Sequence, residues 1–124
     1  MATRSYIGRL KNETVKYIYC HFDGYPRHNG KLLLQNYTDP AVIDELIELG
    51  DMSSLNENIE MCSYYGRDRK EKGCDYRTAQ SLSEFEKLLD YVDYLYYFSE
   101  GNWYVIGGEY KSWAMVTPRV CCCD

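Results

Sequence analysis

The residues best suited to chemistry lie close together near the N-terminus, between Tyr17 and Gly30. This stretch, YIYCHFDGYPRHNG, contains both histidines of the chain along with Cys20, Asp23 and Arg27. A cysteine near a histidine is typical of nucleophilic catalysis, and histidines near a carboxylate are typical of metal binding. Charged and aromatic side chains on a turn are typical of recognition. The stretch therefore raises three functional hypotheses.

Nucleophilic catalysis by Cys20 and His21 is the weakest of the three. Residues 14–22 have the character of a strand, and successive residues of a strand point to opposite faces of a sheet. The two neighbours therefore cannot form a catalytic pair, although His28 could fold back onto Cys20 across the turn. We interpret Cys20 as a small buried hydrophobic residue and assign no catalytic residue.

A metal site would use His21, Asp23 and His28, with Cys62 or Cys74 as a further ligand. No pair of these residues has the spacing of a standard zinc motif together with a matching second pair. A small metal-dependent hydrolase is therefore the third choice among the functional hypotheses. We assign no metal ligand and no cofactor from the sequence.

The turn between Asp23 and Gly30 suits recognition better than catalysis. Gly24 can take a positive φ angle, Pro26 fixes its own φ, and an aspartate beside a glycine accepts local backbone N–H groups. These features explain the shape of the turn but not the aromatic, cationic and imidazole groups beside it. Because binding residues concentrate on loops held by a rigid frame, we predict a first set of binding residues: Asp23, Tyr25, Arg27 and His28.

A second candidate site lies in the sequence YYGRDR, residues 64–69. Arginines beside tyrosines bind phosphate or carboxylate groups and stack on bases or aromatic rings. Tyr64, Arg67 and Arg69 complete the set of predicted binding residues. The simpler interpretation is a solvated charged loop, because residues 67–73 include no apolar side chain.

Two predicted strands, residues 3–10 and 14–22, form the hairpin that leads into the first turn. In the second strand, alternate residues place apolar side chains on both faces, which predicts a central strand covered on both sides. A short helix is expected over residues 31–37, directly after the turn. The turn should therefore join a core strand to a helix that packs on the same sheet.

Two further helices have clear end signals. The helix expected over residues 40–49 has Asp39 as its N-cap, a proline in its first position and Gly50 after its last turn. Ser83 followed three residues later by Glu86 is a capping box that predicts the start of the next helix. Both helices carry an apolar stripe at helical spacing.

The remaining segments are interpreted as loops at 51–58 and 67–73, strands at 59–65 and 75–80, an aromatic hairpin of 93–98 with 102–106, and a last strand at 111–116. The sum is a small single α+β domain over residues 1–118, with an antiparallel sheet and two or three helices packed on it. Residues 119–124, which include Cys121, Cys122 and Cys123, are expected to form a frayed tail.

Composition limits the class of partner. The 124 residues include 14 Lys and Arg against 19 Asp and Glu, which gives a formal net charge of −5. This balance disfavours nonspecific nucleic-acid binding. The sequence begins with no apolar segment typical of a signal peptide, and no apolar run is long enough to cross a bilayer. We therefore expect a cytoplasmic protein with reduced cysteines and no membrane partner.

Several motifs follow the pattern of one family: YIYCHFDGYP at 17–26, Gly30, Leu33-Leu34, Tyr37, GDMSSL at 50–55 and YGRDR at 65–69. Through these motifs, which cover roughly the N-terminal half, the chain resembles a family of small uncharacterised proteins encoded by bacteriophages and prophages. Trp often stands in that family where this chain has Phe22, and the triple-cysteine tail is not part of the pattern. The resemblance implies no established activity.

What the resemblance implies is a context. Small acidic phage proteins without an evident catalytic set commonly bind and disable a host machine, including restriction, CRISPR or nucleotide-signalling defence. The leading hypothesis is a non-enzymatic phage accessory protein that binds a host protein or protein complex in the host cytoplasm and inhibits a bacterial defence system, as anti-CRISPR proteins do. The alternative is a sponge-like module that binds a nucleotide or signalling phosphate. Both hypotheses rest on the resemblance to phage proteins and not on an identified binding or catalytic site.

Overall fold

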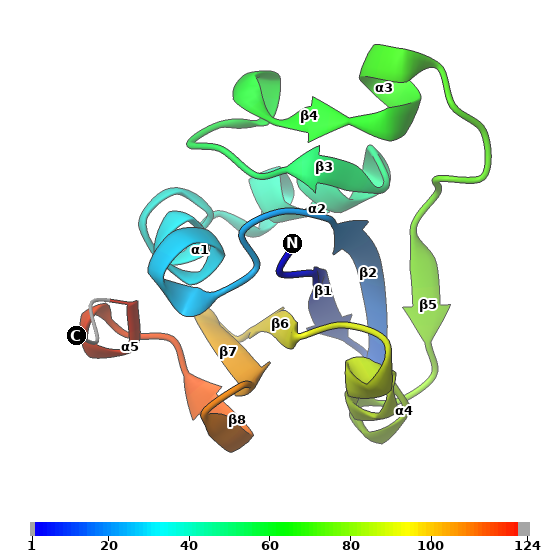
Figure 1. The fold of residues 1–124 in the computed structure, drawn as a ribbon. Helices are drawn as coiled ribbons and strands as arrows, with labels where there is room; N and C mark the ends of the chain where they lie inside the picture. The colour runs from blue at the N-terminus through cyan, green and yellow to red at the C-terminus, as the bar shows by residue number, and fades with distance from the viewer. Residues whose placement is uncertain (1, 122–124) are drawn as a thin grey trace.

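The computed structural model, which describes residues 2–121, shows a small α+β domain built on one mixed sheet (Figure 1). The strands follow the order β4-β3-β2-β1-β6-β7-β8, and β5 pairs with β2. The strands are β1 (Ser5–Lys11), β2 (Thr14–Cys20), β3 (Met52–Ser54), β4 (Ser63–Tyr64), β5 (Arg77–Ala79), β6 (Tyr94–Ser99), β7 (Asn102–Gly107) and β8 (Tyr110–Met115). The helices are α1 (Lys31–Asn36), α2 (Pro40–Glu48), α3 (Tyr65–Arg69), α4 (Leu82–Glu86) and α5 (Pro118–Cys121), with further helical turns of other types at η1 (Pro26–Gly30), η2 (Ile59–Met61) and η3 (Lys87–Asp90).

The β1–β2 hairpin at the centre of the sheet confirms the predicted N-terminal strand pair. Its register runs from the Ser5–Cys20 pair to the tight turn. The two residues between the strands have positive φ angles of 52° and 69°, which match the twist of a hairpin turn. Both faces of β2 pack into an apolar core, as its alternating pattern predicted: Ile18 and Cys20 lie in one core, and Val15 and Tyr17 lie in the other, while Tyr19 stays partly exposed.

The sheet is mixed rather than antiparallel throughout, because two of its pairings are parallel. Strand β1 runs parallel to β6, and β2 runs parallel to β3. Parallel neighbours need a crossover connection, and α1 and α2 supply one between β2 and β3. The pairs β6–β7 and β7–β8 are antiparallel, so the predicted aromatic hairpin is confirmed.

Two apolar cores lie on the two faces of the sheet. The larger core lies under α1, α2 and α5 and includes Leu33, Leu46 and Trp103. The smaller core lies under α4 and η3 and includes Phe85 and Leu95. Figure 1 shows α1 and α2 on one side of the sheet and α4 on the other. Because α4 has only five residues, it covers only part of its face.

The helix ends agree with the predicted caps at α2 and differ at α4. Asp39 accepts a hydrogen bond at 2.9 Å from the backbone N–H two residues on, and Gly50 has a φ of 87° beyond the last turn. The N-cap predicted at Ser83 is wrong. Ser81 is the N-cap instead, and its Oγ accepts from Glu84 N at 3.0 Å. Ser81 has the extended backbone that an N-cap residue requires.

Four short segments differ from the expected structure. Residues 52–54, expected in a loop, form β3, and residues 65–69 form α3. The strand expected over 59–65 is the turn η2 followed by the two-residue strand β4. Asn29 and Gly30, expected as a turn, belong to η1, which continues into α1. Elements this short are set by tertiary contacts rather than by their own propensity.

The C-terminal segment enters the fold through α5, which packs against η1 and α1. Cys121, the first cysteine of the segment expected to fray, is 3% exposed and belongs to the larger core. Cys122, Cys123 and Asp124 lie outside the described residues. None of the helices in residues 2–121 is long and apolar enough to cross a membrane.

Candidate functional site

The turn that follows β2 is fastened to the sheet at Gly24. Tyr96 Oη donates a buried hydrogen bond to Gly24 O at 2.6 Å, and Gly24 N donates to Thr3 O at 2.8 Å. A Cβ atom at Gly24 would lie 2.9 Å from both Thr3 O and Ser5 Cβ. Position 24 therefore requires glycine, because a side chain there would clash with Thr3 and Ser5. The positive φ expected at Gly24 occurs at Asp23 instead, where it is 57°.

Asn29 fastens the other end of the turn from within the core. Its fully buried Nδ2 donates to Ser5 Oγ and to Cys20 Sγ, each at 3.4 Å. Its backbone N–H is shared between Tyr25 O at 3.1 Å and Asp23 O at 3.3 Å. Cys20 is also fully buried, and this burial raises the pKa of its thiol to about 12. A thiol that stays neutral agrees with the interpretation of Cys20 as a packing residue.

The first predicted set lies on the outer side of this fastened turn. Tyr25 is 37% exposed, and its hydroxyl donates to Asp23 Oδ1 at 3.2 Å. The His28 ring lies edge-on to the Tyr25 ring, with 6.2 Å between centroids, and His28 Nδ1 is 2.9 Å from Asn29 Oδ1. Arg27 is exposed beside them. The structure thus brings these four side chains together on one turn, and it is Asn29 rather than His28 that contacts Cys20.

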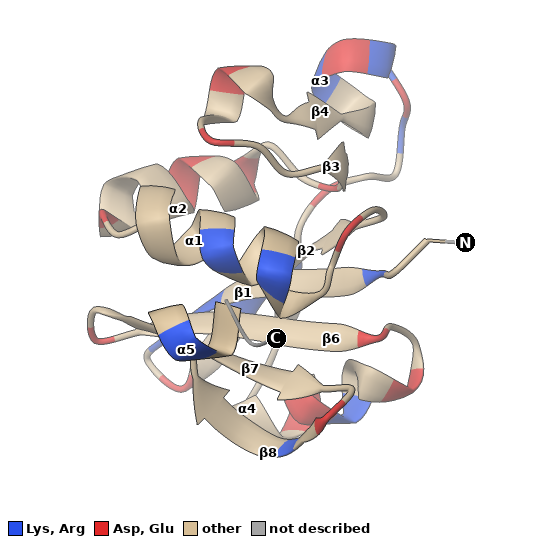
Figure 2. Cartoon of the chain, turned by 60° about the vertical axis from the view of Figure 1, so that its left-hand side comes forward, with Lys and Arg blue, Asp and Glu red and all other residues tan. Residues whose placement is uncertain are grey.

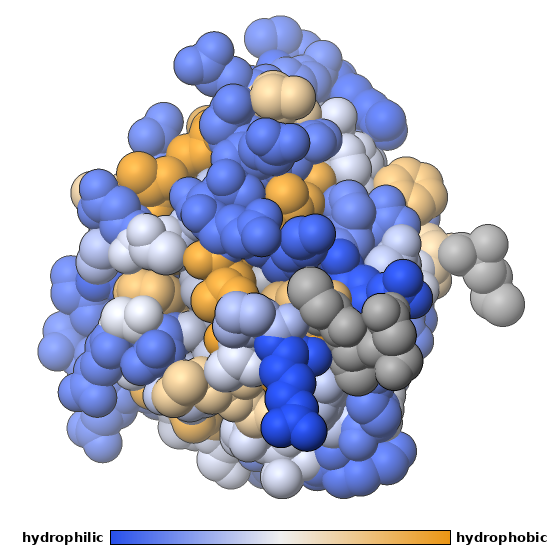
Figure 3. Space-filling view, turned by 90° about the vertical axis from the view of Figure 1, so that its left-hand side faces the viewer, coloured by the Kyte–Doolittle hydropathy of each residue, from blue (hydrophilic) through white to orange (hydrophobic). Residues whose placement is uncertain are grey.

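The turn belongs to a basic surface of an acidic protein. Residues 24–38 and 110–123 contain no Asp or Glu, and α5 from the second segment packs against η1 and α1 from the first. Figure 2 shows basic residues on η1, α1 and α5, on one side of the molecule. We call this the basic face and define it by Arg27, His28, Lys31 and Arg119. Figure 3, which looks onto the side of the molecule near the C-terminus, shows hydrophilic surface interspersed with small apolar areas.

A shallow hollow of about 420 Å³ lies within the basic face. Arg27, His28 and Lys31 line it, together with the amide side chains of Gln35 and Asn36. Leu32 and Glu57 complete the lining. Arg27, His28 and Lys31 around an open hollow suit a phosphate or carboxylate group.

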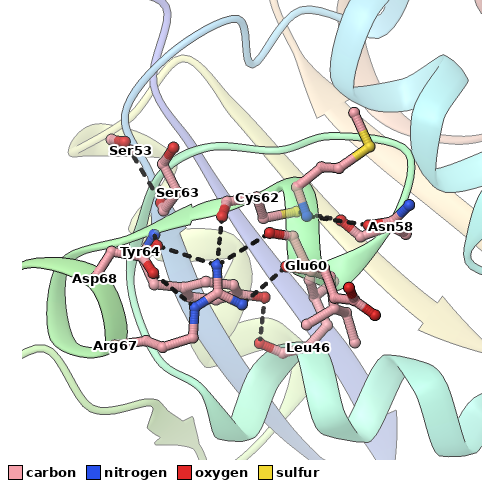
Figure 4. Close-up of polar contacts among 11 residues, drawn as sticks. Leu46, Ser53, Asn58, Glu60, Cys62, Ser63, Tyr64, Arg67 and Asp68 are labelled. Atoms are coloured by element: carbon pink, nitrogen blue, oxygen red, sulfur yellow. Dashed lines mark hydrogen bonds and ion pairs between the residues drawn. The ribbon is translucent and has the colours of Figure 1, made fainter.

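Arg67, from the second predicted set, is held inside its own loop (Figure 4). Its guanidinium donates to Ile59 O at 3.0 Å and to Cys62 O at 2.7 Å, and its Nε pairs with Asp68 Oδ1 at 2.9 Å. The group also lies 4.7 Å from the centre of the Tyr64 ring. Its hydrogen bond to Asp68 raises the pKa of Arg67 and lowers that of Asp68. Arg67 therefore closes the loop between η2 and α3.

Tyr64 is part of the core rather than of the surface. It is 1% exposed, and its hydroxyl donates to Leu46 O at 3.5 Å. Burial raises the pKa of Tyr64, so the hydroxyl stays protonated. Arg69 is the exposed member of the second set, and its guanidinium lies 5.2 Å from the centre of the Tyr65 ring. Only Arg69 of the second set is thus placed to meet a partner.

The two predicted sets do not form one surface. Phe22 N donates to Ser53 O at 2.9 Å, which places β3 beside the residue before the turn. Ser54 then pairs with Ser63 of β4. Strands β3 and β4 therefore separate the turn from α3, and Figures 1 and 2 both show α3 away from α1 and α5.

A cluster that the sequence did not reveal joins Arg69 to the central strands. Tyr6 and Tyr19 are direct cross-strand partners on β1 and β2, and their ring centroids are 5.9 Å apart. Tyr19 Oη lies 2.7 Å from His21 Nδ1. Tyr65 N donates to Asp51 O at 3.2 Å, and Asp51 Oδ1 accepts from Tyr19 N at 2.8 Å, so α3 begins beside the tyrosine pair. We call this cluster the aromatic–arginine surface: Arg4, Tyr6, Tyr19, His21, Tyr65, Arg69 and Arg77.

Part of the aromatic–arginine surface had a signal in the sequence. Tyr19 and His21 lie on one face of a strand by simple alternation, and the hairpin register then brings Tyr6 opposite Tyr19. Arg77 had no such signal, because β5 reaches β2 only through a long connection.

The metal hypothesis requires several ligand side chains close together in the fold. Within residues 2–121, no group of three or more His, Cys, Asp or Glu side chains is arranged to hold a metal ion. His21 Nδ1 lies beside Tyr19 Oη, and His28 Nδ1 lies beside Asn29 Oδ1. His21 and His28 thus have separate hydrogen-bond partners.

Comparison with known proteins found no family model, no curated protein and no solved structure that matches the chain.

Proposed function

We propose that the protein acts by binding, as a phage accessory protein that inhibits a bacterial defence system through contact with a host protein or protein complex. The observation that carries this proposal is the fastened turn at residues 23–30. Buried hydrogen bonds from Tyr96 and Asn29 hold its backbone, while Tyr25, Arg27 and His28 lie outside. A pre-organised turn loses little conformational entropy when it binds, and this favours recognition.

The basic face determines the chemistry of the partner. Arg27, Lys31 and Arg119 provide positive charge in a chain whose net charge is −5, so the rest of the surface repels an acidic partner. Such an asymmetric charge distribution orients the encounter with an acidic surface. We therefore expect the host partner to present acidic residues to η1, α1 and α5. The phage and defence context comes from the family resemblance and from no feature of the fold.

The double substitution Arg27→Glu/Lys31→Glu is expected to weaken partner binding about tenfold, because it reverses two charges in the contact. The measurement is quantitative affinity purification from host lysate, combined with phage plating on hosts that carry defence systems. The matched control is Lys72→Glu/Lys87→Glu, which makes the same charge change at exposed positions outside the basic face. Equal partner recovery and equal plating by the two double variants would contradict the proposal.

A nucleotide or signalling phosphate is the second candidate ligand, and the hollow of about 420 Å³ beside Arg27, His28 and Lys31 favours it. A ligand that binds only the folded state raises the melting temperature. Cyclic and linear nucleotides at millimolar concentration should therefore raise Tm by several degrees, and Arg27→Glu/Lys31→Glu should abolish the rise. If no nucleotide raises Tm, the basic face is assigned to contact with a protein partner and not to nucleotide binding.

A further inference from the structure

The aromatic–arginine surface lies on the opposite face of the sheet from α1 and α2. Helix α4 covers the part of this face around Tyr17. The Phe85 ring of α4 lies 5.4 Å from the Tyr17 ring, centroid to centroid. Beyond that contact the row of rings continues edge to face, from Tyr17 to Tyr6 at 5.1 Å and 71° and from Tyr6 to Tyr19 at 5.9 Å and 66°. Tyr6, Tyr19 and His21 remain partly exposed. The open part of the face is thus a row of rings on the two central strands.

Arginines accompany the rings. The Arg77 guanidinium lies 5.8 Å from the Tyr6 ring centre and 5.4 Å from that of Tyr17. Asp51 holds it with two hydrogen bonds, at 2.9 and 3.3 Å. Arg4 is exposed and directly precedes β1, two residues before Tyr6, and its carbonyl oxygen accepts from Tyr94 N at 3.2 Å.

The rings and arginines on and beside β1, β2 and β5, together with Tyr65 and Arg69 of the adjacent helix α3, suit a ligand that has both bases and phosphates. Partly exposed aromatic rings contact nucleobases, and exposed guanidinium groups bind the phosphates between those bases. We propose that the aromatic–arginine surface binds single-stranded nucleic acid, with bases stacked on Tyr6 and Tyr19 and phosphates bound by Arg4 and Arg69.

The nearby acidic groups decide how strong this binding is. Asp51 is already paired with Arg77, Asp93 Oδ2 accepts the backbone N–H of Arg4 at 2.9 Å, and Glu71 N donates to Tyr65 O at 3.1 Å. Stacking therefore carries more of the affinity than charge does. With two phosphates neutralised, the logarithm of the association constant should fall with the logarithm of salt concentration at a slope of about −1.4. This shallow slope separates the proposed binding from nonspecific attraction to a basic patch.

The test is fluorescence anisotropy with labelled 15-residue oligo-dT and oligo-rU, at several salt concentrations. Wild type should bind in the micromolar range, and Tyr19→Ala should weaken binding at least about fivefold. Tyr19→Phe keeps the ring and should bind nearly as wild type does. Arg4→Glu and Arg69→Glu change exposed residues, so these substitutions test the surface without unfolding the protein. A preference between the two oligonucleotides assigns DNA or RNA.

Matched controls lie on the other face. Tyr25→Ala removes an exposed ring from the turn, and Arg119→Glu reverses a charge on the basic face, so neither should change oligonucleotide affinity. Loss of binding in these controls, with retention in Arg4→Glu and Arg69→Glu, would overturn the proposal. Absence of oligonucleotide binding at low salt would overturn it as well. If thymidine monophosphate binds as tightly as the oligonucleotide does, the surface binds a free nucleotide, and the proposal of single-stranded nucleic-acid binding is overturned.

Discussion

Raising the pH from 9 to 12 is expected to lower the free energy of unfolding by about 3 kcal/mol through Cys20 alone. Burial raises the pKa of this thiol from 9.0 to about 12, against the opposing hydrogen bonds from Asn29 and to Phe22. The unfolded chain loses the proton above pH 9, whereas the folded protein keeps it until about pH 12. The unfolded state therefore binds fewer protons across this window, and stability falls with pH. The loss per pH unit approaches about 1.4 kcal/mol in the middle of this window and is smaller near either pKa, which gives about 3 kcal/mol in all.

Urea denaturation followed by circular dichroism at pH 8, 9, 10, 11 and 12, under reducing conditions, measures this loss. Tyr94 adds to it at the upper end, because burial and the neighbouring Glu109 raise its pKa to about 12. The control is Cys20→Ala, which is less stable at pH 8 but should lose less stability per pH unit above pH 9. A wild-type slope in Cys20→Ala would show that the buried thiol is not the titrating group.

The sequence predicted those parts of the fold that local chemistry determines. Alternation showed that β2 lies between two cores, and Asp39 with Gly50 marked the ends of α2. The direction of the strands was not predictable, because apolar alternation is the same in parallel and antiparallel neighbours. Strand β3, with three residues, forms because Met52 pairs with Cys20 and Tyr64, which are distant in sequence.

The candidate site was predictable to the same extent. Turn residues around Pro26 marked the segment that displays Tyr25 and Arg27, because Gly and Pro restrict the backbone whatever surrounds them. The role of Arg67 was not predictable, since its acceptors Ile59 and Cys62 are backbone carbonyls whose direction depends on η2. An arginine that binds its own loop and an arginine that waits for a ligand have the same sequence signature.

The substitution Arg67→Ala is expected to lower the free energy of unfolding by about 2–3 kcal/mol, whereas Arg69→Ala should change it by no more than about 0.5 kcal/mol. Arg67 donates to two half-buried carbonyls, Ile59 O and Cys62 O, and stacks on the buried Tyr64 ring. Its removal leaves those carbonyls without their charged donor. Arg69 is exposed and touches only the Tyr65 ring among the contacts described for it.

Urea denaturation at pH 7 compares the two variants, and Arg67→Lys separates charge from geometry. A lysine keeps the positive charge beside Asp68 but cannot direct a fork of N–H groups at Ile59 O and Cys62 O together. Arg67→Lys should therefore lose most of the stability that Arg67→Ala loses. Full stability in Arg67→Lys would mean that attraction to Asp68 is the main contribution. If Arg67→Ala is instead as stable as wild type, Arg67 does not stabilise its loop and is again a candidate for partner binding.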